Sequence, residues 1–478
     1  MIVTWTLVFE LGYLLGLGFV PRVLSKRKEP AATLAWLLAV MLLPYVGLAA
    51  YFAIGAPSFR RRARRKRAAN DRLAPGLARI EDALQQDEAC RFDPTVLDDR
   101  RREIMRLGAE VADMPVLGGN AVDIFEDGRA AFPALEAAIA AAHDHVHVEY
   151  YIFRPDATGR RLLALLADRA RAGVEVRLLV DGLGSFALSD RELAALREAG
   201  GKASVFLPVS LVRRPLAFNF RNHRKIVVVD GRVAFTGGLN VGDEYSGRRR
   251  YAWRDTHMRI EGPAVASLGE VFAEDWFFAT HEELTAARYF PPPRRTGDVV
   301  AQVIDSGPDQ PQQSIHRILF SAITLAERRL WLTTPYFVPD PAILVALQCA
   351  ALRGVDVRIL LPSKGDLPLV QAAGRSFYDE LLDAGCRIWE YQPVMLHAKT
   401  MTIDGCWGTV GSANMDIRSF RLNFEVNLIA YGRSFAQRLE QIFETDLARS
   451  TEVQKDERHV HGSTRLLQSA ARVMAPVL

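Results

Sequence analysis

The chain has 478 residues, of which 24% are charged and 49% are hydrophobic. This length exceeds what one hydrophobic core usually serves, so we expect two or more domains. The composition excludes an intrinsically disordered protein. The net charge is only +4, but it is unevenly spread, because residues 60–67 read RRRARRKR. The four cysteines are widely spaced and form no CxxC pair, which argues against a disulfide framework or a zinc site.

The first 58 residues are predicted to form a transmembrane helical hairpin. Residues 2–20 contain a single charge, Glu10, and residues 33–54 contain none. Both segments are long enough for a membrane helix, and Pro44 can be tolerated where neighbouring helices or water satisfy the freed carbonyl. The basic residues follow the first apolar run, which excludes a cleaved signal peptide. Two buried helices of a soluble protein are the less favoured alternative.

Residues 59–110 are predicted to be a basic, helical connector. A basic run beside an apolar segment favours an anionic membrane surface as partner, and no nucleic acid is expected. A merely solvated run is the alternative. The stronger cluster, residues 60–67, is expected on the cytoplasmic side together with everything that follows. If one apolar segment were re-entrant, residues 22–29 and 60–67 would lie on the same side.

The remainder contains an internal repeat. The first copy has a strand pattern at 145–153, a helix at 160–172 and a second strand from Gly173; the second copy has them at 330–338, 341–353 and from Gly354. Another helix and strand follow at 189–205 and 376–389. This alternation predicts an α/β fold with two similar lobes, 111–290 and 291–478, each a β-sheet flanked by helices.

The last segment is predicted to be an amphipathic helix capped by Ser463. Packing on the domain and lying in the membrane interface are both open for its apolar stripe. The stripe comprises Leu466, Leu467, Ala470, Val473, Met474 and Val477.

Each copy of the repeat reaches the same motif, H-x-K-x4-D-x6-G-[GS]-x-N. The motifs read NHRKIVVVDGRVAFTGGLN and LHAKTMTIDGCWGTVGSAN. Two matches at corresponding places of a repeat are very hard to explain by chance. The candidate site residues that they contain are His223, Lys225, Asp230, Gly238, Asn240, His397, Lys399, Asp404, Ser412 and Asn414.

The spacing within the motif has a physical meaning. Histidine and lysine two residues apart on a strand lie on one face, so an imidazole and an ammonium group converge on one ligand. Asp-Gly between apolar strands is a hairpin signal, which gives Asp230 and Asp404 a mainly structural role. Gly238 and Ser412 are expected to permit close backbone approach to a phosphate. The two asparagines are expected to donate to the phosphate or to brace the site.

The motif pair resembles the phospholipase D superfamily, in which motifs from two lobes form one active site. The flanking segments FNFRNHRKIVVVDG, GGLNVGDEY, EYQPVMLHAKT and GSANMDIRSFRLNFEVN are similar to its bacterial cardiolipin synthase branch. The resemblance covers most of the chain after residue 110. It implies a multi-pass enzyme of the bacterial cytoplasmic (inner) membrane, with cytoplasmic lobes, that works without a metal or other cofactor.

The resemblance also implies a mechanism. Two phosphatidylglycerol molecules would yield cardiolipin and glycerol, with His223 attacking phosphorus to form a phosphatidyl-histidine. His397, protonated at first, would act as acid and then as base, and Lys225 and Lys399 would neutralise the phosphate. The alternatives are a membrane-bound phospholipase D-type hydrolase, a membrane-tethered nuclease, and a scaffold with a dead catalytic repeat. Both intact histidine–lysine pairs argue against the scaffold.

Members of the superfamily place an acid after each motif to orient the histidine. Asp255 and Glu425 are the candidates, each on a predicted strand downstream of one motif; salt bridges to neighbouring arginines are the alternative. Tyr336 is a candidate substrate contact, although core packing is equally compatible with its position. Glu149 and Tyr151 of the corresponding strand in the first copy are also candidate substrate contacts, with core packing equally compatible for Tyr151. The alternating residues His143, His145 and His147 are interpreted as structural or surface residues.

Overall fold

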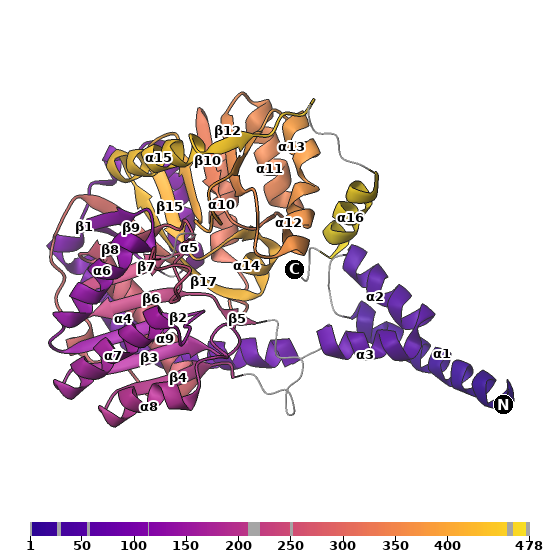
Figure 1. Ribbon diagram of the computed structural model, residues 1–478, viewed down its shortest axis with the longest axis horizontal. Coiled ribbons are helices and arrows are strands. Elements are labelled where there is room, and N and C mark those ends of the chain that lie inside the picture. Colours follow the sequence, from indigo (N-terminus) through magenta and orange to yellow (C-terminus); the bar gives the residue numbers. More distant parts are fainter. Residues whose placement is uncertain are drawn as a thin grey trace.

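The computed structural model describes residues 2–25, 30–54, 58–112, 114–208, 220–248, 252–456 and 462–474. It shows an α/β fold with two lobes side by side and a group of N-terminal helices that projects from one side (Figure 1). The first lobe lies below the second in this view, and the helices α1 to α3 extend to the right.

The N-terminal helices are α1 (Ile2–Leu24), α2 (Pro30–Leu42) and α3 (Pro44–Ile54). The single long helix expected over residues 33–54 is therefore wrong, because the chain bends sharply at Pro44. Proline lacks the N–H and crowds the preceding turn. Gly47 permits the bend, since a Cβ there would lie 2.2 Å from the Ala39 carbonyl oxygen. Among the described residues, no helix combines the length and the apolar character needed to cross a membrane.

The predicted connector packs on both lobes: its first helix contacts the helix at 264–280, and its second helix contacts the strand at 299–306 and the helix at 314–325. Helix α4 (Ser58–Gln86) buries Ala69, Leu73 and Leu77 against Phe277, and helix α5 (Asp99–Ala112) follows. Two short 3-10 turns, Glu88–Cys90 and Pro94–Val96, link these helices. Arg64, Arg65 and Arg67 of the basic run are exposed, whereas Lys66 is 1% exposed. The basic run is therefore not wholly a surface feature, and the side chains of residues 60–62 lie outside the description.

The first lobe alternates strands and helices as the repeat predicts. Its elements are β1 (Val116–Phe125), α6 (Gly128–Ala140), β2 (His145–Tyr150), α7 (Ala157–Arg171), β3 (Glu175–Asp181), α8 (Asp190–Glu198), β4 (Lys202–Phe206), β5 (Arg221–Asn222), β6 (Lys225–Val229), β7 (Val233–Gly237), β8 (His257–Glu261) and α9 (Ala264–Thr280). A 3-10 turn at Ala287–Tyr289 leads to the second lobe.

The second lobe repeats this order. Its elements are β9 (Val299–Ser306), α10 (Ser314–Leu325), β10 (Arg329–Thr333), β11 (Phe337–Val338), α11 (Pro341–Leu352), β12 (Asp356–Pro362), α12 (Pro368–Arg375), α13 (Tyr378–Asp383), β13 (Arg387–Tyr391), β14 (Thr400–Ile403), β15 (Trp407–Gly411), β16 (Met415–Asp416), α14 (Ile417–Arg421), β17 (Asn423–Tyr431), α15 (Arg433–Leu447), β18 (Ser450–Glu452) and, after a gap in the description, α16 (Gly462–Val473). The strand and helix predictions for both copies are confirmed, while the limits of the domains stay a prediction.

One mixed sheet runs through both lobes. Its order is β18-β13-β12-β10-β14-β15-β17-β9-β1-β8-β7-β6-β2-β3-β4. The antiparallel pair β1–β9 lies at the centre, and from it the equivalent strands of the two lobes follow outward in the same order. Successive residues of β6 face opposite cores, as the period of two requires: Val227 packs with α6 and α7, and Ile226 with α9. The two halves are therefore fixed to each other by strand pairing and by a shared core.

Candidate active site

The peptide segments that carry the two histidines pair with the opposite lobe. Strand β5, which ends immediately before His223, pairs in parallel with the start of β17, and the His223 N–H donates to the Phe424 carbonyl at 2.9 Å. In the same way the His397 N–H donates to the Arg254 carbonyl at 2.7 Å. The two histidines therefore meet at the boundary between the lobes, each held by backbone from the other lobe.

The orienting acids are exchanged between the lobes. His223 Nδ1 lies 2.9 Å from Glu425 Oε2, and His397 Nδ1 lies 2.7 Å from Asp255 Oδ2. The sequence places Asp255 downstream of the first motif and Glu425 downstream of the second, yet each carboxylate contacts the histidine of the other motif. The arrangement requires both lobes at once, so neither lobe contains a complete site.

These contacts fix the tautomer of both rings. Burial alone would raise the pKa of Asp255, but the charges of Lys399 and His397 lower it. Burial opposes ionisation of Glu425 in the same way, and His223 and Lys225 lower its pKa. Because an ionised carboxylate only accepts hydrogen bonds, Nδ1 of each ring carries the proton. The Nε2 lone pair of His223 is therefore left for chemistry, and that of His397 faces the Lys399 ammonium group at 3.2 Å.

Both imidazoles are hard to protonate in this site. Burial is the main cause that lowers the pKa of His223 to about 4, with Lys225 adding to it and Glu425 opposing it. Burial and the charge of Lys399 lower the pKa of His397 to about 3. Both rings are thus neutral at pH 7, which differs from the expected initially protonated His397. A proton on His397 needs additional negative charge nearby, and a phosphodiester would supply it.

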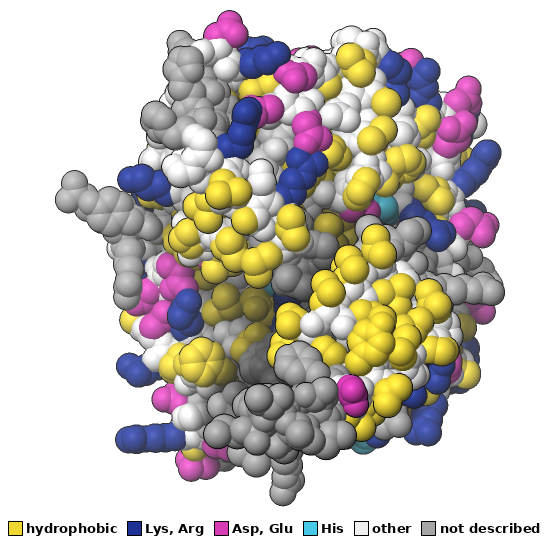
Figure 2. Space-filling model, turned by 90° about the vertical axis from the view of Figure 1, so that its right-hand side faces the viewer, with side chains coloured by type: hydrophobic (Ala, Val, Ile, Leu, Met, Phe, Trp, Pro, Cys, Tyr) yellow, Lys and Arg dark blue, Asp and Glu magenta, His cyan; other side chains and the backbone are white. Residues whose placement is uncertain are grey.

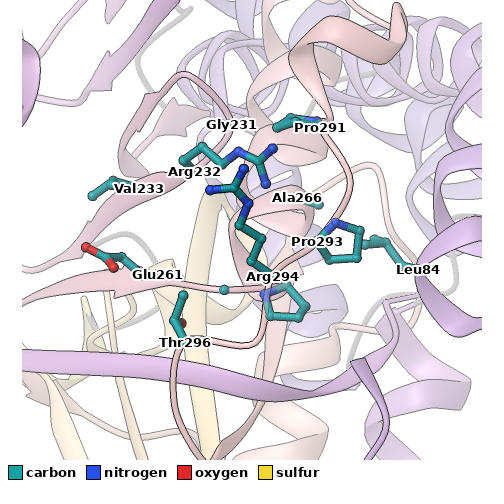
Figure 3. A pocket seen from close by; sticks show the side chains of 12 residues that line it. Leu84, Gly231, Arg232, Val233, Glu261, Ala266, Pro291, Pro293, Arg294 and Thr296 are labelled. Carbon is teal, nitrogen blue, oxygen red and sulfur yellow. The ribbon is translucent and has the colours of Figure 1, made fainter. Parts of the chain in front are cut away.

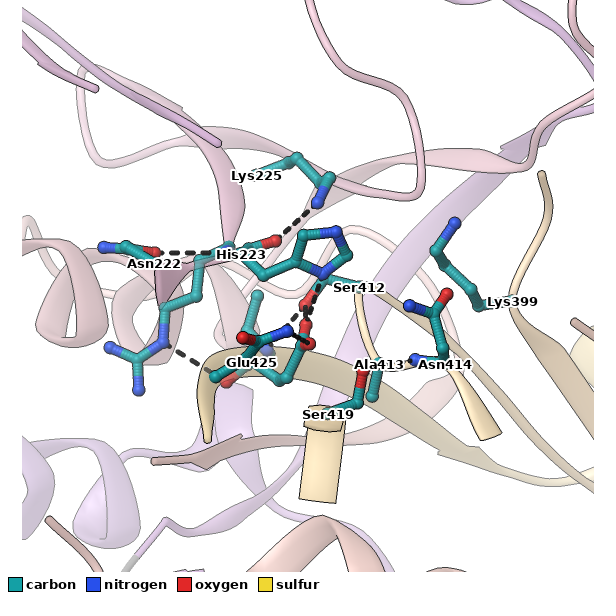
Figure 4. A network of polar contacts seen from close by, with 12 residues as sticks. Asn222, His223, Lys225, Lys399, Ser412, Ala413, Asn414, Ser419 and Glu425 are labelled. Atoms are coloured by element: carbon teal, nitrogen blue, oxygen red, sulfur yellow. Dashed lines mark hydrogen bonds and ion pairs between the residues drawn. The ribbon is translucent and has the colours of Figure 1, made fainter. Parts of the chain in front are cut away.

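The two lysines form an anion-binding centre. The Lys225 ammonium group donates to the His223 carbonyl at 2.5 Å, and Lys399 Nζ lies 3.2 Å from His397 Nε2. Burial lowers the pKa of Lys225 to about 7 and that of Lys399 to about 8, and the charge of Lys399 contributes to the shift of Lys225. In Figure 4, Lys225 lies above the His223 ring and Lys399 lies to its right; Lys225 begins β6 and Lys399 directly precedes β14. A bound anion would relieve the unfavourable burial of both ammonium groups.

Gly238 and Ser412 occupy equivalent places but serve the acids differently. A Cβ on Gly238 would lie 2.0 Å from Asp255 Oδ1, so the absence of a side chain makes room for that carboxylate. The Ser412 hydroxyl donates to Glu425 Oε2 and accepts from the Val426 N–H at 2.9 Å. The expected close approach to a phosphate stays a prediction, and the contacts present here position the acids.

The two asparagines also differ. Asn240 accepts from the Ile152 N–H at 3.2 Å and donates to the Tyr245 hydroxyl at 3.0 Å, so it braces the loop that follows the first motif. The Asn414 Oδ1 atom is buried and has no hydrogen-bond partner. Asn414 lies beside Lys399 in Figure 4, and a buried unsatisfied amide next to an anion-binding centre is suited to contact a substrate.

Aromatic rings line the histidines. The Tyr151 ring centroid lies 4.9 Å from that of His223. Around His397, the centroid distances are 5.2 Å to Trp253, 5.6 Å to Tyr245 and 6.1 Å to Tyr336. The sequence interpretation missed Trp253 and Tyr245; the only signal was their place between the first motif and Asp255.

Tyr336 itself is held by a carboxylate. Its hydroxyl donates to Asp366 at 2.8 Å, from the loop that follows β12. Burial and the Asp366 charge raise the pKa of Tyr336. The tyrosine is therefore a neutral, fixed wall beside His397.

A buried ionic cluster supports the His223 segment from behind. Arg224 donates to Asp275 and to Asp305, both at 2.7 Å, and Asn222 donates to Asp275 at 3.0 Å. Lys66 of α4 completes the cluster with Nζ 2.9 Å from Asp275. Sequence reasoning missed this cluster, because its members come from distant segments and Lys66 sits inside a run of exposed arginines.

Asp230 and Asp404 lie away from the histidine centre and hold the hairpin ends. The turns join β6 to β7 and β14 to β15, as the Asp-Gly pairs predict. The carboxylate of Asp230 accepts from the backbone N–H groups of residues 143–145, and that of Asp404 from residues 327–329. Both aspartates have positive φ, 51° and 54°. Their mainly structural role stays a prediction, which these contacts support.

Two residues of strand β2 that the sequence singled out make contacts inside the lobe. Glu149 is 1% exposed and accepts from Asn222, and burial together with the Asp275 charge raises its pKa well above the ordinary value. The His147 ring stacks on Phe272 at 4.6 Å. Within the described ranges, no three His, Cys, Asp or Glu side chains are arranged to hold a metal ion.

A cavity of about 190 Å³ lies at the other end of β6, next to the Asp230 turn (Figure 3). Arg232 and Arg294 point into it, and burial together with the Arg294 charge lowers the pKa of Arg232. The cavity contains none of the histidine, lysine or carboxylate groups described above. We therefore place the reaction at the boundary between the lobes.

The two histidines are related by pseudo-symmetry, and each has a lysine of its own motif and an acid from the other lobe. This arrangement defines a phospholipase D-like enzyme. A family model described as "Cardiolipin synthase, PLD-like domain" matches residues 135–276 and 319–447, and one described as "Phospholipase_D-nuclease N-terminal" matches residues 14–55. The chain belongs to the cardiolipin synthase family of phospholipase D-like phosphatidyltransferases.

Curated relatives cover almost the whole chain. A cardiolipin synthase of Geobacillus kaustophilus is 38% identical over 96% of this chain and 92% of its own length. Cardiolipin synthase A of Pseudomonas entomophila is 38% identical over 98% of both. The crystal structure of a phosphatidylserine synthase from Haemophilus influenzae covers 79% of this chain and 100% of its own, with a TM-score of 0.60 and 14% identity, and shows the same fold.

Proposed function

We propose that this enzyme condenses two phosphatidylglycerol molecules into cardiolipin and glycerol through a phosphatidyl-histidine on His223. The observation that carries the proposal is the exchange of acids between lobes, which prepares both imidazoles in the same tautomer around one lysine-lined centre. Relatives over nearly the full length are named cardiolipin synthases, which supports a lipid alcohol rather than water as acceptor.

In the first step, Nε2 of His223 attacks the phosphorus of the first lipid. The phosphodiester charge raises the pKa of His397, which acquires a proton and donates it from Nε2 to the departing glycerol oxygen. The P–O bond breaks, a P–N bond forms, and glycerol leaves. Lys225 and Lys399 neutralise the charge that builds on the non-bridging oxygens.

In the second step, neutral His397 takes the proton from the hydroxyl group of a second phosphatidylglycerol. That oxygen attacks phosphorus, the P–N bond breaks, and its electron pair returns to His223. Glu425 and Asp255 stabilise whichever ring carries positive charge at each stage. The buried, aromatic-lined site limits the access of water, the competing acceptor.

The N-terminal helices are proposed to lie in the bacterial cytoplasmic membrane, with the lobes on the cytoplasmic side. Exposed apolar side chains on α1 to α3 support this placement, among them Leu14 at 66%, Leu42 at 73% and Val46 at 65% exposed. The bend at Pro44 favours a re-entrant arrangement of α2 and α3, which would put both basic clusters on one side. Exposed Arg64 and Arg65 are then near anionic head groups.

The reaction is tested with phosphatidylglycerol labelled separately in its acyl chains and its terminal glycerol. Purified enzyme should release one labelled glycerol for each cardiolipin formed. Free phosphatidic acid as the main product would instead establish a hydrolase.

Topology is tested on native Cys349, the exposed cysteine of the second lobe. An impermeant maleimide should modify it only after spheroplasts are permeabilised. Modification in intact spheroplasts would overturn the cytoplasmic placement.

A further inference from the structure

The C-terminal helix α16 is attached to the second lobe by one narrow face. Gln468 and Ala471 are buried, and α12 is the helix against which α16 packs. Arg472 forms an ion pair with Glu380, and its guanidinium carbon lies 4.2 Å from the centroid of the Phe377 ring. The attachment therefore uses small and polar side chains rather than the apolar stripe.

The apolar stripe of α16 faces outward. With 100° between successive residues, Leu466, Ala470 and Val473 fall on the side opposite Gln468 and Ala471, and Leu467 and Met474 flank the buried side. Leu466, Leu467 and Val473 are 72%, 57% and 81% exposed. An amphipathic helix of a soluble domain ordinarily buries this side. Of the two alternatives left open by the sequence, packing of the stripe on the domain is therefore wrong for the described residues; Val477 lies outside them.

The outward stripe is continued by the start of α12. Leu367 and Leu369 are 49% and 40% exposed. Leu367 directly follows Asp366, the carboxylate that holds the Tyr336 hydroxyl beside His397. We call Leu367, Leu369, Leu466, Leu467, Val473 and Met474 the α12–α16 surface. This surface reaches the second-lobe edge of the active site.

The α12–α16 surface lies on the same side of the molecule as the N-terminal helices. In Figure 1, α16 lies above α2, and α12 lies between α16 and the rest of the second lobe. Figure 2, which looks at that side, shows apolar side chains gathered in separate areas across this face. The exposed leucines of α1 to α3 and those of the α12–α16 surface therefore lie on one side of the molecule, although the two segments are more than 300 residues apart in the chain.

We propose that the α12–α16 surface lies in the interfacial region of the lipid bilayer, as a second membrane contact beside the active site. The occupant is a bilayer rather than a protein because the same face carries the apolar N-terminal helices. The inference is about attachment to the membrane and does not depend on which alcohol accepts the phosphatidyl group.

The contact is tested by measuring membrane depth on the full-length chain. Cys349 is changed to Ser, because it is the exposed cysteine and Cys90, Cys386 and Cys406 are buried. A nitroxide is then attached at Leu466→Cys, and in a matched protein at Thr445→Cys on α15, which lies on the far side in Figure 1. Both proteins are reconstituted in phosphatidylethanolamine–phosphatidylglycerol vesicles.

The label at position 466 should be shielded from a water-soluble nickel chelate and exposed to oxygen, at a depth of about 5–10 Å below the phosphates. The label at 445 should be accessible to the chelate. Equal accessibility of both labels to the chelate would overturn the proposal. Shielding that is the same in detergent and is accompanied by spin–spin broadening would also overturn it, because a second copy would then be the occupant.

A functional measurement supplements the depth measurement. The triple variant Leu466→Ser, Leu467→Ser, Val473→Ser replaces only exposed side chains, so it should retain its activity in mixed micelles, where substrate reaches the site without a bilayer. In vesicles its activity should fall by about fivefold or more, because the lost apolar contact lets the site tilt away from the leaflet. An unchanged ratio of vesicle to micelle activity would contradict the proposed contact.

Discussion

Replacing Asp255 with Asn tests the exchange of acids most sharply, because it changes one atom at the contact with His397. Asp255 Oδ1 accepts from the Thr256 N–H at 2.8 Å, and Oδ2 contacts His397 Nδ1 at 2.7 Å. In the variant, the amide oxygen stays with Thr256, so the NH2 group faces Nδ1. The ring must then accept at Nδ1 and carry its proton on Nε2, the tautomer that cannot act as a base.

The magnitude follows from the comparable change in the histidine–carboxylate pair of a serine protease. There, an Asp→Asn change that imposes the wrong histidine tautomer costs about 10⁴-fold in kcat, and each factor of ten corresponds to about 1.4 kcal/mol. We expect a loss of about 10³- to 10⁴-fold, or roughly 4 to 5.5 kcal/mol of transition-state stabilisation.

The assay is initial-rate formation of cardiolipin in mixed micelles. The matched control is Asp123→Asn, which makes the same change at a carboxylate on β1 whose side chain is 64% exposed and pairs with Arg259; its rate should stay close to that of the wild type. Thermal unfolding of both variants checks the fold. A folded Asp255→Asn enzyme with more than a tenth of wild-type activity would refute the assignment of Asp255 to His397.

Three further predictions follow from the same structure. Gly238→Ser should cost nearly as much activity as Asp255→Asn, because its Cβ would displace the carboxylate; activity within threefold of wild type would contradict this. Lys66→Met should lower the free energy of unfolding by about 1.5–3 kcal/mol, since Asp275 loses one of its two cations and keeps Arg224, whereas Arg64→Met should change it little. Equal thermal stability of the two variants would contradict the role of Lys66. The pKa values of His223 and His397 are lowered in the folded protein, so the unfolded chain binds more protons between pH 6.5 and about 4, and stability should fall as pH falls through this window. A variant with both histidines changed to Gln should lose less stability from pH 7 to pH 5. An identical loss in the variant and the wild type would contradict the pKa shifts.

The repeat and the motifs could be predicted from the sequence because they rest on local patterns. Alternation and glycine signals located β2, β3, β10 and β12, and Asp-Gly located both hairpins. The histidine–lysine pairs were found from spacing alone. The acids Asp255 and Glu425 were found as well, but their partners were not, because chain order suggests the nearer histidine and only the pairing across the lobes reverses it.

Other features depend on tertiary contacts that leave no local pattern. Lys66 is indistinguishable in sequence from the arginines around it, yet the turn of α4 directs it to Asp275. The reason for glycine at position 238 becomes visible only with the Asp255 carboxylate beside it. The apolar stripe of α16 was predicted correctly as a pattern, but which of its faces meets the lobe depends on the complementary surface of α12.

In the proposed reaction, the two lobes form one site in which His223 becomes covalently attached to the lipid phosphate. The direct measurement uses His397→Ala enzyme with a phosphatidyl ester of p-nitrophenol, a leaving group that needs no proton from an acid. We expect a burst of about one nitrophenolate per enzyme, and a phosphatidyl adduct found by mass spectrometry on the peptide that contains His223. Absence of the burst, or an adduct on any other residue, would rule out His223 as the nucleophile.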